Sequence, residues 1–177
     1  MTPGATILLA LAACGRGGTP GPEGEPLPDP AATAEIRNAA GERIGLATFT
    51  TADTGASLAI SVSGLTPGRH GIHVHQNGDC TARDFSGAGE HFNPTARKHG
   101  LDNSDGPHAG DMPNLTVESD GSADTTLPIS ADLLRPVAPS IGGARSMALV
   151  IHADPDDQLT DPSGNSGDRV ACGVIEG

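Results

Sequence analysis

The sequence contains no Trp, no Tyr and only three Phe among its 177 residues. A core must therefore be built from Val, Ile, Leu and Ala, which favours many short strands over large helices. Basic residues are also scarce: ten Lys and Arg stand against 22 Asp and Glu, for a formal net charge of −12. This balance argues against nucleic acid and anionic lipid surfaces as partners, because both are bound mainly through Lys and Arg.

The chain has no long apolar run at its start, where MTPGATILLALAAC holds only the short stretch Ile7 to Ala13. This stretch cannot span a bilayer but has the length of the core of an export signal. Leu11 to Cys14 resembles the lipobox of bacterial lipoproteins, in which the Cys is lipidated and becomes the first residue after cleavage. Signal peptides normally begin with basic residues, which Met1 to Thr6 lacks, so a chance apolar N-terminus is the alternative.

The organisation of the chain follows from these observations. We expect residues 1–14 to be a lipoprotein-type signal peptide, the Gly- and Pro-rich residues 15–34 to be a flexible tether, and residues 35–177 to form one domain. The expected location is the bacterial cell envelope, either the periplasm or a membrane surface reached through the lipid on Cys14. A homodimer is left open, because nothing in the sequence decides the oligomeric state.

The three cysteines of the sequence bear on export and lipidation as well. Lipidation of Cys14 would leave Cys80 and Cys172 as a pair. An oxidising compartment permits a disulfide between them, and two buried free thiols are the alternative.

Short stretches of strand-like composition recur after residue 34, separated by turns rich in Gly, Asp, Asn and Pro. They read AEIRNAAGERIGLATFT, SLAISVSGL, GIHVHQ, NLTVES, ADTTLPI, SMALVIHA and VACGVIE. Several alternate apolar and polar residues with period two, and none keeps a helical period over ten residues, so an all-β sandwich or barrel is predicted. Thr81 to Pro113 and Asp154 to Asp168 are long, polar and poor in strand signals, and we interpret them as two functional loops.

The histidines concentrate in particular places. In GIHVHQ, strand alternation places His73 and His75 on one face and Ile72 and Val74 on the core face. The two histidines then project outward with Cβ atoms about 7 Å apart, close enough to share a metal ion. Two polar residues on an ordinary strand would be the alternative reading of this motif alone.

A second cluster places His91, His99, His108 and Asp111 within 21 residues of loop. Three imidazoles and a carboxylate can close a tetrahedral zinc site. A solvated loop with incidental histidines would explain the polarity, but not the clustering, nor His152 at the end of the otherwise apolar SMALVIHA. The residues therefore predict two metal sites.

Several collinear motifs resemble the copper/zinc superoxide dismutases from about Glu35 to Gly177. They are GIHVHQNGDC, GEHFNPTARKHG, HAGD, LVIHADPDD and GNSGDRVACGVI. The resemblance implies an eight-stranded antiparallel Greek-key β-barrel or sandwich of immunoglobulin-like architecture, with one copper and one zinc ion per chain. It also implies an enzyme that converts two superoxide anions and two protons into oxygen and hydrogen peroxide.

Carried over residue by residue, the resemblance assigns roles to the clusters. Copper would be held by His73, His75, His91 and His152, and zinc by His91, His99, His108 and Asp111. Asp156 would accept hydrogen bonds from His73 and His99, Cys80 and Cys172 would form a disulfide, and His91 and Arg169 would act in catalysis, Arg169 by attracting the anion. His70 lies on the other strand parity from His73 and His75, and we interpret it as structural.

One departure from the family pattern concerns substrate attraction. The segment from Asp156 to Asp168 is short and has no Lys, while Asp157, Asp161 and Asp168 add negative charge near Arg169. A second hypothesis is a dismutase-like, non-catalytic metal-binding surface lipoprotein. Such a protein would be expected to lose a copper ligand or the arginine, and this chain keeps all of them.

Overall fold

A computed structural model describes Met1 and residues 31–52, 55–134 and 146–177. The expected signal peptide, the lipidation site at Cys14 and most of the expected tether lie outside these residues. The first strand begins at Ala32, three residues before the expected start of the domain. Ala32, Ala34 and Ile36 are buried, and the residues between them are partly or fully exposed. The small side chains at the start of the strand therefore belong to the core.

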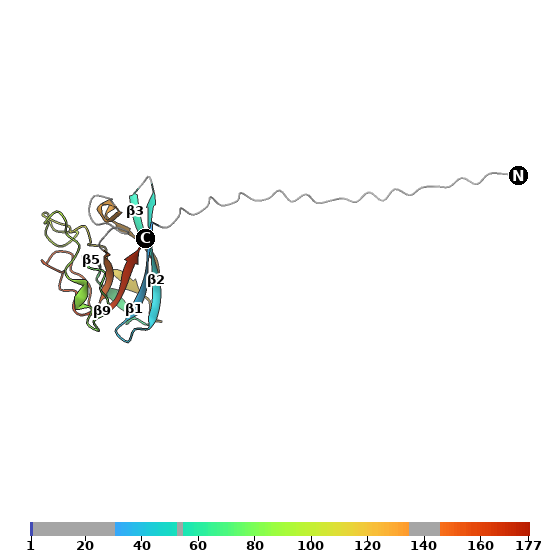
Figure 1. The fold of residues 1–177 in the computed structure, drawn as a ribbon, viewed down its shortest axis with the longest axis horizontal. Coiled ribbons are helices and arrows are strands. Elements are labelled where there is room, and N and C mark those ends of the chain that lie inside the picture. Colours follow the sequence, from blue (N-terminus) through green and yellow to red (C-terminus); the bar gives the residue numbers. More distant parts are fainter. Residues whose placement is uncertain (2–30, 53–54, 135–145) are drawn as a thin grey trace.

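Nine strands and two short 3-10 turns make up the regular structure of the described residues (Figure 1). The strands are β1 Ala32–Asn38, β2 Arg43–Ala52, β3 Gly55–Val62, β4 Gly68–His70, β5 Ile72–His75, β6 Leu115–Val117, β7 Ala123–Ile129, β8 Ala148–His152 and β9 Arg169–Glu176. The turns are η1 Ser86–Ala88 and η2 Ala131–Leu134. The all-β prediction is confirmed, and the strand NLTVES is shorter than its sequence suggested.

Gly71 is the single residue between β4 and β5, so joining these two strands gives the expected eight. At this point the chain changes partners. Gly71 donates its N–H to Asp154 O (2.8 Å), and its own carbonyl accepts the His152 N–H (2.8 Å). A Cβ at position 71 would lie 2.7 Å from Ser166 Cβ, and glycine is therefore required for this close approach.

All strand pairs are antiparallel. Seven strands follow the order β5-β8-β9-β1-β2-β3-β7, and β4 pairs with β6 in a second, two-stranded sheet. Because β4 and β5 are joined through Gly71, the two sheets continue into one another and enclose a common core. The order departs from the chain order beside β1, where β9 returns to pair, and beside β3, where β7 pairs. Such returns are the pattern of a Greek key.

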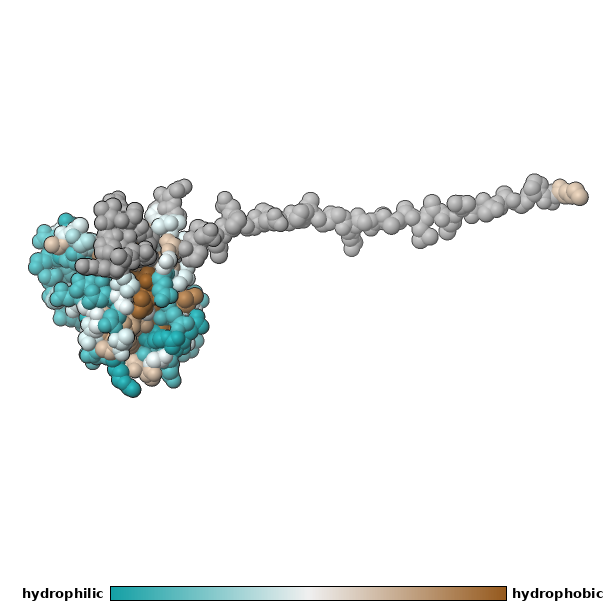
Figure 2. Space-filling view, in the orientation of Figure 1, coloured by the Kyte–Doolittle hydropathy of each residue, from teal (hydrophilic) through white to brown (hydrophobic). Residues whose placement is uncertain are grey.

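Aliphatic side chains dominate the core, as the composition predicted. Ile36, Leu58, Ile72 and Leu149 are fully buried, and Phe49 is the largest fully buried side chain. In the view of Figure 2 the outer surface is mostly hydrophilic, with small hydrophobic areas between polar ones. No helix in the described ranges combines the length and the apolar character needed to cross a membrane.

Candidate metal centre

The two long loops lie over the outer face of β5. His73 and His75 point away from Ile72 and Val74, as alternation predicted, yet they are only 0% and 1% exposed. The reason is that the loop between β5 and β6 pairs with β5: Phe92 N donates to Val74 O (2.8 Å) and Val74 N donates to Gly110 O (2.9 Å). The expected outward face is therefore correct, but the loops seal it from solvent.

The backbone pairing also brings loop side chains to the strand. His91 lies opposite His75, and Asp111 lies opposite His73, each in an isolated antiparallel bridge. Gly110 permits this approach, since a Cβ there would lie 2.2 Å from Val74 O. On the other edge, β5 pairs with β8, whose last residue is His152. Strand and loop residues thus converge on the same place.

The first cluster, here called the four-histidine set, is buried and compact. It consists of His73, His75, His91 and His152, whose candidate ligand atoms lie within 4.8 Å of one another. One ring nitrogen of each is buried without a hydrogen-bond partner: His73 Nδ1, His75 Nε2, His91 Nε2 and His152 Nε2. Buried polar atoms are normally paired, so four unpaired nitrogens facing one another fit a metal ion.

The opposite ring nitrogens of this set are held by the protein. His73 Nε2 donates to Asp156 Oδ2 (2.7 Å), His75 Nδ1 donates to Gly89 O (2.9 Å), and His152 Nδ1 donates to Gly167 O (3.2 Å). Each bond fixes the orientation of a ring and keeps the proton on the nitrogen that faces away from the cluster.

The second cluster, here called the mixed set, is built around one carboxylate oxygen. Asp111 Oδ1 lies 2.9, 3.1 and 3.3 Å from the Nδ1 atoms of His91, His99 and His108. Asp111 Oδ2 accepts the backbone N–H groups of Gly100 and His108, both at 2.9 Å. The four side chains are buried and their candidate ligand atoms lie within 4.8 Å of one another, as a tetrahedral metal site requires.

His91 belongs to both sets. Its Nδ1 faces Asp111 in the mixed set, and its unpaired Nε2 faces the four-histidine set. One imidazole can therefore contact two metal ions at once.

Asp156 connects the two sets from behind. Its Oδ2 accepts from His73 Nε2 (2.7 Å), and its Oδ1 accepts from His99 Nε2 (3.0 Å). Asn114 in turn fixes the backbone of Asp156, donating Nδ2–H to its carbonyl (2.8 Å) and accepting its N–H at Oδ1 (2.7 Å). Asp156 thus contacts His73 and His99, the two residues that the family resemblance implied, while the supporting Asn114 was missed.

The four-histidine set is held in its neutral form. Burial lowers the pKa of His73 despite the Asp156 hydrogen bond, and it lowers the pKa of His75 well below the usual value. Burial also lowers the pKa of His91 to about 4 and that of His152 to about 3. Neutral imidazole is the form that binds a metal, so these rings are ready to act as ligands near neutral pH.

The mixed set has the opposite electrostatics. Burial alone would raise the pKa of Asp111, but hydrogen bonds with His91 and His99 outweigh it and hold that pKa well below the ordinary value. Burial alone would lower the pKa of His99, whereas its bonds to Asp111 and Asp156 raise it to about 9. Asp111 therefore stays charged and His99 is held as its protonated partner near neutral pH, so a cation that binds here must displace the His99 proton.

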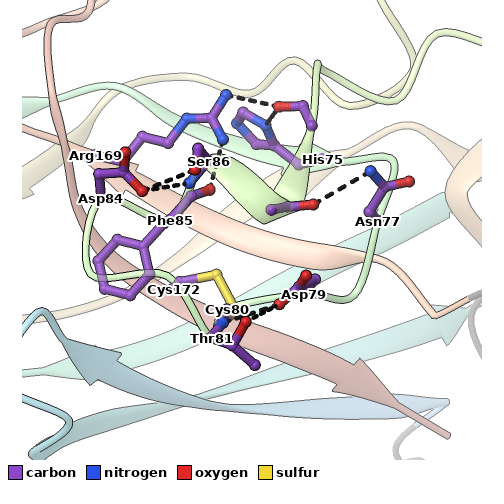
Figure 3. The surroundings of a disulfide bond; sticks show 12 residues. His75, Asn77, Asp79, Cys80, Thr81, Asp84, Phe85, Ser86, Arg169 and Cys172 are labelled. Atoms are coloured by element: carbon purple, nitrogen blue, oxygen red, sulfur yellow. Dashed lines mark hydrogen bonds between the residues drawn. A yellow bond between two sulfur atoms is a disulfide. The ribbon is translucent and has the colours of Figure 1, made fainter.

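Arg169 begins β9 and lies beside the four-histidine set. Its Nη1 donates to Phe85 O and its Nη2 to Gly89 O, both at 2.6 Å. The carbonyl oxygen of Gly89 also accepts the His75 ring N–H, so one oxygen connects the arginine to a candidate ligand (Figure 3). Neither carbonyl was foreseen from the sequence, because a backbone acceptor has no side-chain signature.

A disulfide anchors the loop that carries these carbonyls. Cys80 and Cys172 are bonded across a sequence separation of 92 residues, which confirms the pairing that the resemblance implied (Figure 3). Closing a loop of this length stabilises the folded chain by about 3–5 kcal/mol in the loop-entropy model. Cys172 lies in the strand that begins with Arg169, so the loop is tied directly to the arginine's own strand.

His70 stays outside both sets. It is buried, its Nδ1 lies 2.7 Å from His152 O and its Nε2 lies 2.8 Å from Thr66 O. It joins the backbone of β8 to the turn before β4, in line with the structural role expected of it.

Comparison with known proteins gives one consistent family. The family model described as copper/zinc superoxide dismutase (SODC) matches residues 43–175. "Superoxide dismutase [Cu-Zn] 2" of Aquifex aeolicus is 40% identical over 152 residues, covering 81% of this chain and 85% of that protein. "Superoxide dismutase [Cu-Zn]" of Caulobacter vibrioides is 39% identical over 154 residues, covering 82% and 85%.

Other similar proteins include a relative with a different kind of name. "Superoxide dismutase-like protein YojM" of Bacillus subtilis is 41% identical over 127 residues, covering 71% of this chain and 65% of that protein. Among solved structures, a SOD-like protein from Bacillus subtilis aligns with a TM-score of 0.73 at 37% identity, covering 80% of this chain and 96% of that one. The Cu/Zn superoxide dismutase from Brucella abortus aligns with a TM-score of 0.67 at 30% identity, covering 82% and 99%.

Proposed function

The chain belongs to the copper/zinc superoxide dismutase family, and from this membership we propose that it converts two superoxide anions and two protons into oxygen and hydrogen peroxide. The four-histidine set holds one copper ion and the mixed set holds one zinc ion. The observation that carries this assignment is the group of four buried ring nitrogens that face one another without a hydrogen-bond partner. Their donor type suits copper, and three imidazoles with one carboxylate suit zinc.

The metals and the chain contribute differently to the reaction. Copper, when bound, supplies the one-electron oxidation and reduction that dismutation needs, whereas zinc has no accessible redox step and contributes charge and structure. Arg169 attracts the superoxide anion and orients it beside His75. His91 holds and releases a proton at Nε2, while its Nδ1 faces the mixed set beside Asp111.

A non-catalytic metal-binding protein is the alternative, because one similar protein is named superoxide dismutase-like. What supports turnover in this chain is the complete four-histidine set together with Arg169 next to it. A binding module has no need of a guanidinium held beside the metal ligands.

Metal removal tests the proposed function. We expect the purified protein to contain about one copper and one zinc ion per chain, one for each of the two ligand sets, and to consume superoxide. Chelation of copper should abolish superoxide consumption, and added copper should restore it, whereas added zinc alone should not. A protein that contains only zinc, or whose activity is unaffected by copper chelation, would contradict the proposal.

We also propose that the chain is exported and anchored to a bacterial membrane by a lipid on Cys14. The lipobox-like Leu11 to Cys14 supports this, and so does the Cys80–Cys172 disulfide, because disulfides persist in oxidising compartments. Mass spectrometry of the native N-terminus is expected to find a lipidated Cys14 as the first residue. An unmodified Cys14 still preceded by Ala13 would refute lipidation.

A further inference from the structure

The position of Arg169 depends on a loop rather than on its own strand alone. Both terminal nitrogens of the guanidinium are bonded to loop carbonyls, those of Phe85 and Gly89. The orientation of the Arg169 guanidinium therefore depends on the contacts that fix the direction of these two carbonyl groups. The carbonyl oxygen of Gly89 also accepts a hydrogen bond from the ring of His75. The direction of the Phe85 carbonyl is fixed separately, by the turn that contains it.

Asp84 fixes the turn that contains Phe85. Asp84 Oδ1 accepts the backbone N–H of Ser86 (3.1 Å) and the Ser86 hydroxyl (2.8 Å), which closes a turn around Phe85 (Figure 3). Phe85 has a φ of 54°, in the left-handed region that bulky residues rarely occupy. Aspartate side chains stabilise such turns by hydrogen bonding two residues ahead. The turn thus keeps the Phe85 carbonyl directed at Arg169.

Asp84 also affects Arg169 through its charge. Asp84 directly precedes Phe85, whose carbonyl accepts the Arg169 Nη1–H, so the carboxylate lies near the guanidinium. Burial lowers the pKa of Arg169, and the Asp84 charge acts in the opposite direction. Two of the three acidic residues that the sequence placed near Arg169 are engaged elsewhere: Asp161 accepts a hydrogen bond from Lys98 Nζ (2.8 Å), and Asp157 accepts the backbone N–H groups of Leu159 and Thr160 in its own loop. Asp84 was not singled out, because it lies 85 positions away from Arg169 along the chain.

We propose that Asp84 is a positioning residue with two opposed effects on superoxide capture, an inference that rests on the proposed function. Its hydrogen bonds hold the Phe85 carbonyl where it orients Arg169. Its negative charge weakens the attraction between Arg169 and the anion. The two effects can be separated, because asparagine keeps the oxygen and loses the charge, whereas alanine loses both.

The test compares Asp84→Asn with Asp84→Ala in the copper- and zinc-loaded protein. At low ionic strength we expect Asp84→Asn to consume superoxide about twofold faster and to bind azide, an anionic probe of the copper site, about twofold more tightly, as removal of one nearby charge in water allows. We expect Asp84→Ala to be about twofold slower than the unmodified protein and to bind azide about twofold more weakly, because loss of a turn bond of this kind outweighs the gain from charge removal.

Salt distinguishes the two effects further. At high ionic strength the advantage of Asp84→Asn should disappear, since exposed charges are screened, while the deficit of Asp84→Ala should persist because it is geometric. In an Arg169→Ala background neither Asp84 variant should change azide binding further, as a double-mutant cycle would reveal. Equal rates for Asp84→Asn and Asp84→Ala would overturn the positioning role and show that Phe85 packing and the disulfide suffice.

Asp120 provides the matched control. Its Oδ1 accepts the N–H (3.0 Å) and hydroxyl (2.6 Å) of Ser122 in the same kind of turn, located between β6 and β7. Asp120→Asn and Asp120→Ala should leave rate and azide affinity unchanged, and a matching change there would overturn the inference. If the unmodified protein binds azide but consumes no superoxide, the proposed function fails, while the opposed azide shifts of the Asp84 variants still support the positioning role.

Discussion

Replacing His152 with Ala is expected to abolish superoxide consumption while leaving a folded, zinc-containing protein. His152 Nε2 is one of the four unpaired nitrogens of the four-histidine set, and its ring has no part in the mixed set. Loss of an outer hydrogen-bond partner alone weakens metal binding roughly 10- to 100-fold, so loss of a ligand should weaken copper binding by more than about 100-fold. Copper and zinc content per chain, together with the superoxide-consumption rate, measure the effect.

His70→Gln is the control for this variant. Of the seven histidines of the chain, His70 is the one that lies in neither set, although it contacts the backbone of His152. Its replacement should reduce thermal stability but preserve copper content. The copper assignment would have to be abandoned if copper-loaded His152→Ala retained the activity of the unmodified protein.

Asp111→Ala is expected to have the largest combined effect on zinc binding and stability. The substitution removes the oxygen around which three imidazoles gather, and it leaves the buried N–H groups of Gly100 and His108 without an acceptor. Breaking a buried charge pair typically costs about 3–5 kcal/mol of unfolding free energy, and we expect a loss of this size in the metal-free protein. Urea unfolding measures the stability, and competition with a chromophoric chelator measures the zinc affinity.

Asp111→Asn separates the two consequences. The amide oxygen can still accept the N–H groups of Gly100 and His108, so most of the stability should return. Its neutral side chain is a poor substitute for a carboxylate ligand, and zinc affinity should stay low. Zinc binding by Asp111→Ala at the strength of the unmodified protein would show that the mixed set is not the zinc site.

Period-two alternation and composition were enough to predict an all-β fold, because the core needs one apolar face per strand. They missed β4, since Gly68–His70 is too short to show alternation and its pairing with β6 is a long-range contact. They also placed the start of β1 too late, because Ala32 and Ala34 carry little signal in a Pro- and Gly-rich context. The Greek-key order came from the family resemblance and not from periodicity.

The side chains that can bind a metal were predictable from the sequence. The groups that hold those side chains in place by hydrogen bonds were not. His91, His99, His108 and Asp111 are close along the chain, so their clustering is visible before folding. His152 meets His73 and His75 only through the pairing of β5 with β8, which resemblance could suggest and spacing could not. Asn114 and the carbonyl of Gly89 act through backbone geometry, which no residue pattern encodes.

The carbonyl oxygen of Gly89 is shared between the ring of His75 and the guanidinium of Arg169. Gly89 itself has a φ of 73°, which other residues rarely adopt, and a Cβ there would lie 2.7 Å from Asn77 Nδ2, so the Asn77 side chain would have to move. A change that shifts this oxygen alters the metal ligand and the anion guide together. Copper binding and anion attraction are therefore not independently adjustable through Gly89: a variant that moves this carbonyl is expected to change both properties at once.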